Sequence, residues 1–115
     1  MRQRTEQEPW VGTFLVGTVR ASYQDLVRTF GLPSWRDDTG GLGDEKVRAE
    51  WDLSTERGDE GVRAGERITL YDWKEWVPLE EVTEWHIGAS YHGEQQGLIG
   101  RLLEQSEPEA KRGKR

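Results

Sequence analysis

KVRAEWDLS, residues 46–54, alternates between charged and apolar side chains from residue 46 to residue 53. A period of two is typical of a β-strand with one buried face and one face in water. The apolar face carries Val47, Ala49, Trp51 and Leu53. RITLYDWK, residues 67–74, has apolar groups on both of its faces, which predicts a central strand. The connection 55–66 is rich in Gly and acidic residues, so the two strands are predicted to form a hairpin with a long loop.

A helix and a further strand are predicted before this hairpin. WVGTFLVGTV, residues 10–19, is rich in β-branched and aromatic residues and predicts a strand, in which Gly12 and Gly17 mark weak points or bulges. In ASYQDLVRTFGLP, Ser22 is a suitable N-cap and Asp25 completes a capping box. Gly31 suits the position just after a helix, so we expect the helix to end there.

The remaining segments complete an α+β pattern. EWHIGAS, residues 84–90, predicts a last strand, and EQQGLIGRLLEQ, residues 94–105, predicts a C-terminal helix. Residues 34–45 and 75–83 are predicted to be a loop and a connection. The order β-α-β-β-β-α predicts a small antiparallel sheet with helix packed on one face. We expect one domain over 10–106, a flexible tail over 1–9 and a basic disordered tail over 107–115.

The charge distribution favours a basic partner. The net charge is −6, from 16 basic and 22 acidic residues. Six of the cations lie near the two ends, which leaves 10 against 22 acids, or −12, for the body of the chain. Such a field repels nucleic acid, so we expect no direct nucleic-acid binding and a partner protein with a basic surface.

Composition also bears on the compartment. There is no Cys, and no apolar run approaches the roughly 20 residues that a membrane span needs. The start MRQRTEQEPW has no apolar core of the kind found in a signal peptide. We therefore expect a cytoplasmic protein without membrane association.

Four motifs follow one another in an order that resembles a known group of proteins. They are SYQDLVRTFGLP, KVRAEWDL, ITLYDWK and EVTEWHIGA, and they cover roughly residues 20–90. The pattern is similar to a family of small, mostly uncharacterised proteins of bacteriophages and prophages, common in phages of actinobacteria. The hairpin 55–66 is longer and more acidic than in that family, and Ala89 stands where Gly is expected. The resemblance implies a phage accessory protein that binds a host protein, such as a defence or nucleic-acid-binding protein, in the host cytoplasm.

The chain offers little that suggests catalysis or a metal site. Asp72, His86 and His92 are the candidates for a metal cluster, but they lack the spacing of known ligand motifs. There is no Ser/His/Asp arrangement with a nucleophile elbow and no recognisable pair of carboxylates. We therefore expect no catalytic residues, no metal, no cofactor and no enzymatic activity.

Two hypotheses of binding remain. In the first, the protein is an acidic inhibitor that docks on a basic host surface through acidic side chains of the loop 34–45 and the hairpin 55–66. These residues are Asp37, Asp38, Asp44, Glu45, Glu56, Asp59 and Glu60. In the second, an aromatic cluster binds or sequesters a small molecule such as a nucleotide, because aromatic rings stack on bases. That cluster is Tyr71, Asp72, Trp73, Lys74, Trp85 and His86, with Trp73 and Trp85 expected to pack as cross-strand partners.

Overall fold

A single antiparallel sheet and two α-helices make up the described residues, 1–37, 47–74 and 77–107, of a computed structural model. The α+β prediction is confirmed. The strands are β1 (Arg2–Gln3), β2 (Phe14–Arg20), β3 (Trp35–Arg36), β4 (Ala49–Ser54), β5 (Arg67–Tyr71) and β6 (Glu84–Ala89). The helices are α1 (Tyr23–Phe30) and α2 (Gln95–Gln105), and a 3-10 turn, η1, spans Leu79–Glu81.

The strands follow the order β1-β4-β5-β6-β2, and each neighbouring pair is antiparallel. β5 lies in the middle, as its two apolar faces predicted. β1 and β3 pair with β4 at different positions, β1 with Leu53 and Ser54 and β3 with Ala49 and Glu50. The register of β2 against β6 shifts between Leu15 and Gly17, in agreement with a bulge at Gly17.

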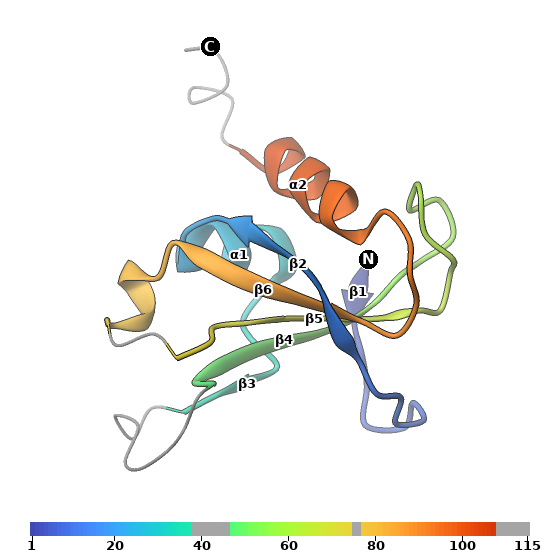
Figure 1. The fold of residues 1–115 in the computed structure, drawn as a ribbon, viewed down its shortest axis with the longest axis horizontal. Coiled ribbons are helices and arrows are strands. Elements are labelled where there is room, and N and C mark those ends of the chain that lie inside the picture. Colours follow the sequence, from blue (N-terminus) through green and yellow to red (C-terminus); the bar gives the residue numbers. More distant parts are fainter. Residues whose placement is uncertain (38–46, 75–76, 108–115) are drawn as a thin grey trace.

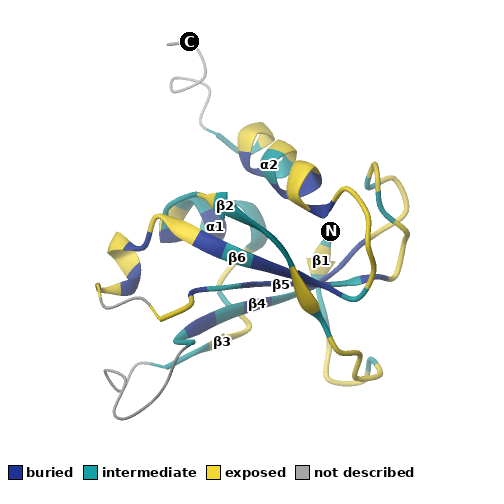
Figure 2. Ribbon diagram, viewed as in Figure 1, coloured by how far each residue is buried: buried dark blue, intermediate teal, exposed yellow. Residues whose placement is uncertain are grey.

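Both helices lie on the same side of the sheet (Figure 1). α2 packs against β2 and β6, and α1 packs against α2 and η1. α1 begins as predicted, because the Ser22 hydroxyl accepts from the Asp25 N–H at 3.0 Å while the Asp25 carboxylate accepts from the Ser22 N–H at 3.0 Å. It ends at Phe30, after which Gly31 takes a φ of 88°, a conformation that glycine adopts without strain. Buried residues line the sides of the helices and strands that face each other (Figure 2).

Three aromatic side chains form the centre of the core between sheet and helices. Trp51 and Trp85 are both fully buried and meet edge to face, with ring centroids 5.4 Å apart. Tyr23 of α1 lies against both rings, at 5.6 and 6.4 Å. The indole N–H of Trp85 donates to the Ala21 carbonyl at 2.9 Å, and that of Trp51 donates to the Gly31 carbonyl at 2.8 Å. The two tryptophans therefore hold both ends of α1 on the sheet.

The structure differs from the predictions in several short segments, and β2, for example, begins at Phe14 rather than at residue 10. Residues 1–9 were predicted to be a loose tail, yet Arg2–Gln3 pairs with β4, and the Gln3 side chain donates to the Phe30 carbonyl at 3.0 Å. The predicted loop 34–45 includes β3. A strand of two residues shows no periodicity, so only pairing with the outer edge of β4 defines it. Asp38, Asp44, Glu45, Lys46 and the tail 108–115 lie outside the described residues.

Candidate functional site

The sheet has one face against the helices and one face turned away from them, called here the open face. Antiparallel pairing places Trp35, Glu50, Tyr71, His86 and Thr18 directly opposite one another in turn, across β3, β4, β5, β6 and β2. The next residues along these strands, such as Trp51, Leu70 and Ile87, are fully buried in the core. Because side chains alternate between faces, the five residues form one continuous row on the open face. This set is called the open-face row.

Three rings cluster around the middle of the row. The Tyr71 and His86 rings meet edge to face at 5.6 Å. Trp73, just beyond the end of β5, stacks on His86 with centroids 6.4 Å apart and planes 25° apart, and it remains 41% exposed. The Lys74 ammonium lies 5.6 Å from the centroid of Trp73. At the β3 end of the row, the Trp35 side chain is 46% exposed. The open face therefore presents aromatic surface to solvent at two places.

Glu50 lies between these two aromatic positions, with Trp35 on one side and Tyr71 on the other. Burial raises the pKa of its carboxyl, and the charge of Arg67 lowers that pKa while the charge of Asp52 raises it. Burial, followed by the charge of Glu50, raises the pKa of the Tyr71 hydroxyl. Within the described part of the chain, the Glu50 carboxylate has no hydrogen bond and no ion pair within 4.0 Å. A half-buried, unpaired carboxylate is therefore the most unusual charge of the open face.

The guanidinium whose charge acts on Glu50, that of Arg67, is already engaged. Arg67 Nε donates to Asp52 Oδ1 at 2.8 Å, and Arg67 Nη2 donates to Asp52 Oδ2 at 3.4 Å. Arg67 Nη1 also donates to the Val11 carbonyl. Arg4 approaches the same carboxylate, with 3.8 Å between its Nε and Asp52 Oδ1. Asp52 is thus compensated by two cations, whereas Glu50 on the same strand forms no ion pair within 4.0 Å with any described residue.

The predicted aromatic cluster divides between the two sides of the sheet. Tyr71, Trp73 and His86 lie together on the open face, while Trp85 and Asp72 are fully buried. The prediction that Trp73 and Trp85 pack as partners is wrong, because Trp85 pairs with Val19 of β2 and turns into the core. β5 ends before Trp73, so the two tryptophans never face each other across a strand pair.

The Asp72 carboxylate forms hydrogen bonds within the fold. Its Oδ1 accepts from the backbone N–H groups of Arg48 at 2.8 Å and Ala49 at 3.0 Å, and its Oδ2 accepts from Arg48 Nε at 3.1 Å. These bonds hold the start of β4 against the end of β5. The Asp72 side chain is fully buried, so a surface ligand does not reach this carboxylate.

The predicted acidic residues lie on a different part of the molecule. The carboxylates of Glu56 and Asp59 approach the Met1 amino group at 2.7 and 2.8 Å. Burial alone would lower the pKa of that amino group, but hydrogen bonds to Asp59 and Glu56 outweigh burial and raise it. Glu60 is exposed, and its carbonyl accepts from Arg101 at 3.1 Å. Asp37 donates its backbone N–H to the Arg48 carbonyl at 2.7 Å.

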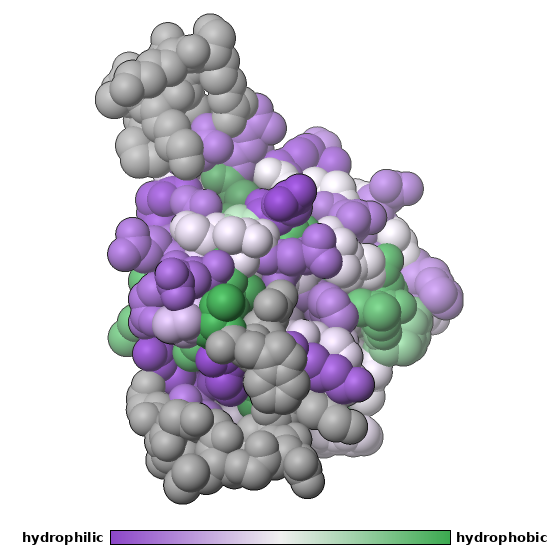
Figure 3. Space-filling view, turned by 60° about the vertical axis from the view of Figure 1, so that its left-hand side comes forward, coloured by the Kyte–Doolittle hydropathy of each residue, from purple (hydrophilic) through white to green (hydrophobic). Residues whose placement is uncertain are grey.

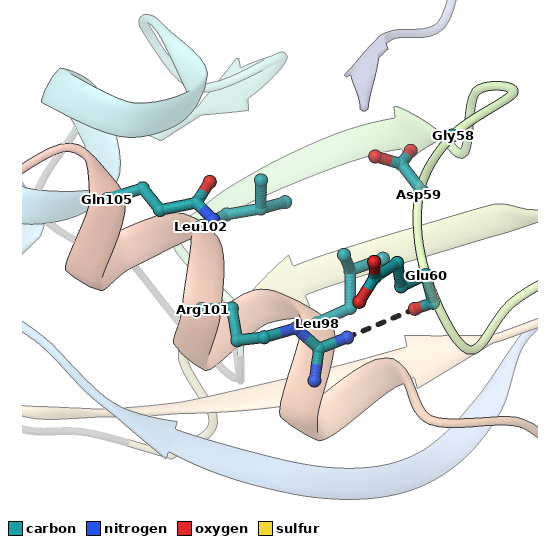
Figure 4. Close-up of a pocket in the computed structure, with 7 residues that line it drawn as sticks. All are labelled: Gly58, Asp59, Glu60, Leu98, Arg101, Leu102 and Gln105. Atoms are coloured by element: carbon teal, nitrogen blue, oxygen red, sulfur yellow. Dashed lines mark hydrogen bonds between the residues drawn. The ribbon is translucent and has the colours of Figure 1, made fainter.

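The hairpin loop and α2 line an open pocket of about 240 Å³ (Figure 4). It is lined by Gly58, Asp59, Glu60, Leu98, Arg101, Leu102 and Gln105. The hydrogen bond from Arg101 to the Glu60 carbonyl joins α2 to the loop at this pocket (Figure 4). Two of the three predicted acidic groups of this hairpin, Glu56 and Asp59, thus share one ammonium group within the fold, which compensates one of their two charges.

The candidate metal residues make separate contacts. Asp72 binds Arg48, His86 lies between Tyr71 and Trp73, and His92 packs on Phe14 with centroids 4.6 Å apart. Among the residues that the structure describes, no three such side chains gather closely enough to hold a metal ion.

Neither described helix has the length and apolar character to cross a membrane. Figure 3 shows a largely hydrophilic surface on which hydrophobic side chains form separate patches.

Gly88 allows residues 11–13 to lie against the open face. A Cβ at Gly88 would meet Thr69 Oγ1 at 2.4 Å and Thr13 Oγ1 at 3.0 Å, and Thr69 is almost fully buried. We expect Gly88→Ala to lower the free energy of unfolding by about 1–3 kcal/mol, because the added methyl overpacks this contact. Urea denaturation followed by circular dichroism measures the change.

Gly100→Ala is the matched control, since a Cβ at Gly100 meets nothing within 4 Å. There the change should be neutral or stabilising by up to about 1 kcal/mol, because alanine favours a helix interior. Equal stabilities of the two variants would contradict the close approach of the Thr13 segment to β6.

Comparison with protein-family models, with curated proteins and with solved structures gives no match to this chain. Sequence reasoning missed Trp35 and Glu50, which were assigned to a loop and to a solvated strand face. The alternation in residues 46–54 did place Glu50 on the wet face. The pairing of β3 with β4, which brings Trp35 beside it, leaves no pattern in the sequence.

Proposed function

We propose that the protein is a non-enzymatic interaction protein whose open face binds a basic segment of a partner protein. The observation that carries the proposal is the open-face row, in which the exposed Trp35 and the partly buried Tyr71 flank a carboxylate that makes no ion pair within 4.0 Å among the described residues. Aromatic side chains are enriched where proteins bind proteins, and cations are attracted to ring faces. The charge of −12 over the body of the chain favours a basic partner over an acidic one.

The proposal keeps the class of partner that the sequence indicated and moves the contact surface. Glu56 and Asp59 are paired with the Met1 amino group, so they contribute less attraction than their number suggests. A host-directed role for a phage-encoded protein, with inhibition of a defence or nucleic-acid-binding protein, stays a prediction from the resemblance. Cytoplasmic action is part of the same proposal.

A nucleotide is the second candidate ligand, favoured by the Tyr71, Trp73 and His86 rings. Glu50 and Glu84 on the same face repel phosphate, which makes a basic peptide the better match. One experiment can test both candidate ligands, because each would perturb the exposed tryptophans of the open face.

The test is a nuclear magnetic resonance titration of the ¹⁵N-labelled protein with an arginine-rich peptide and, separately, with ATP. We expect the peptide to shift the indole N–H signals of Trp35 and Trp73, which are exposed, and to leave those of Trp51 and Trp85, which are buried. Trp73→Ala should weaken peptide binding by about fivefold or more, since a cation–π contact contributes on the order of 1 kcal/mol. Shifts with ATP alone would favour the nucleotide, and shifts confined to α2 and the hairpin would overturn the proposal.

A further inference from the structure

Glu50 differs from Asp52 and Glu84, two other acidic residues of the open face, in its burial and its lack of an ion pair with the described residues. Its strand neighbour Asp52 is bound by Arg67, and Glu84 lies exposed at the start of β6. Glu50 is partly withdrawn from water between two aromatic residues and receives no hydrogen bond from the described residues. A carboxylate in such a position loses hydration without gaining a partner, which costs free energy unless a cation arrives from outside.

The spacing of the row suits a planar cation. Residues directly opposite on neighbouring antiparallel strands have Cβ atoms about 4.5–5.5 Å apart, so Trp35 and Tyr71 stand on either side of Glu50 within reach of one group bound to it. The strands that carry the two rings, β3 and β5, are separated by β4 alone, or roughly 9–10 Å. That gap admits a guanidinium or an ammonium group above the carboxylate.

We infer that Glu50, with Trp35 and Tyr71 on its two sides, is the receptor for an arginine side chain of the partner. The inference rests on the proposed function and names the group that the open face recognises. Arginine fits better than lysine for two physical reasons: its planar guanidinium donates two parallel bonds to a carboxylate, and it stacks on aromatic faces. Arg67 does not form an ion pair with Glu50, because its guanidinium donates to the Asp52 carboxylate and to the Val11 carbonyl.

The pH dependence of binding follows from the same groups. Burial raises the pKa of Glu50, so a proton competes with the arginine as the pH falls through that raised value. Affinity should be fully present above this pKa and lost below it. Among the described residues, the charged or titratable groups that act on Glu50 are Arg67 and Asp52, and the Tyr71 hydroxyl, all on β4 or β5. His86 is the other protonatable group of the row and is replaced by Gln in a parallel measurement.

The experiment is isothermal titration calorimetry with hexa-arginine and hexa-lysine peptides at low ionic strength. Wild type should bind hexa-arginine more tightly than hexa-lysine, and Glu50→Gln should weaken hexa-arginine by about 10- to 100-fold, the usual range for a charge-assisted hydrogen bond. The pH profile of Glu50→Gln should be flat over the range where wild type loses affinity. Glu84→Gln, which removes a carboxylate from the same face outside the row, should change affinity less than about twofold.

The outcomes separate the two proposals. Loss of peptide binding in Trp73→Ala together with unchanged binding in Glu50→Gln would overturn the arginine receptor and leave the open face as the binding surface. Equal weakening by Glu50→Gln and Glu84→Gln would show general charge attraction and would also overturn it. Absence of peptide binding by wild type would overturn both. Circular dichroism of each variant verifies that the fold is retained.

Discussion

Asp72→Ala should lower the free energy of unfolding by about 3–5 kcal/mol, the usual effect of removing one partner of a buried ion pair. The Asp72 side chain is fully buried and accepts three hydrogen bonds, two from backbone N–H groups and one from the Arg48 guanidinium. Without it, the Arg48 side chain, which is 18% exposed, keeps its charge and loses its counter-charge. Because a domain has only about 5–15 kcal/mol of stability, this variant should be close to unfolding.

Chemical denaturation of Asp72→Ala and of Glu84→Ala measures the difference directly. Glu84 is an exposed carboxylate at the start of β6, and its removal should change stability by less than about 0.5 kcal/mol. Asp72→Asn should fall between the two, because its amide oxygen still accepts one backbone N–H while its charge is gone. Similar losses in Asp72→Ala and Glu84→Ala would contradict the buried position of Asp72.

The elements with strong local signals were predictable. The capping box of α1 is a chemical pattern within four residues, and both of its hydrogen bonds form. The alternation in 46–54 placed Trp51 and Leu53 in the core and Glu50 on the other face, as the structure has them. The apolar character of both faces of 67–74 predicted its central place in the sheet.

The predictions that were wrong depended on where strands end and on which strands pair. The alternation of 67–74 had already put Asp72 on the face of Ile68 and Leu70, and Trp73 on that of Tyr71. Asp72 was grouped with the aromatic cluster as a polar group for ligand binding, although this alternation places it on the face of Ile68 and Leu70. The hydrogen bonds from Arg48 and Ala49 that make its burial possible come from a strand more than twenty residues away in sequence.

The candidate site was only half visible for a related reason. Tyr71, Trp73 and His86 were predicted as site residues because aromatic rings stack on bases. Trp35 and Glu50 complete the row only because β3 pairs with β4 and β4 pairs with β5 in one particular register. A register shift of one residue would have turned Glu50 toward the core, so no local pattern could identify it as a site residue.

The second large effect separates two tryptophans that the sequence treats alike. Trp85→Ala should lower the free energy of unfolding by about 3–5 kcal/mol, because it empties a core position filled by a fully buried ring and leaves the Ala21 carbonyl without its indole donor. The same change removes the indole hydrogen bond that holds the beginning of α1 on the sheet. Trp85→Phe should recover part of the loss, since it refills the volume without restoring the hydrogen bond.

Trp73→Ala is the matched comparison, because Trp73 is 41% exposed and lies on the open face. We expect it to cost less than about 1 kcal/mol of stability, as most surface substitutions do, while it weakens peptide binding. Denaturation followed by circular dichroism avoids the loss of fluorescence that either substitution causes. Equal losses of stability in the two alanine variants would contradict the assignment of Trp85 to the core and of Trp73 to the open face. They would also contradict the proposal that the open-face row is a binding surface.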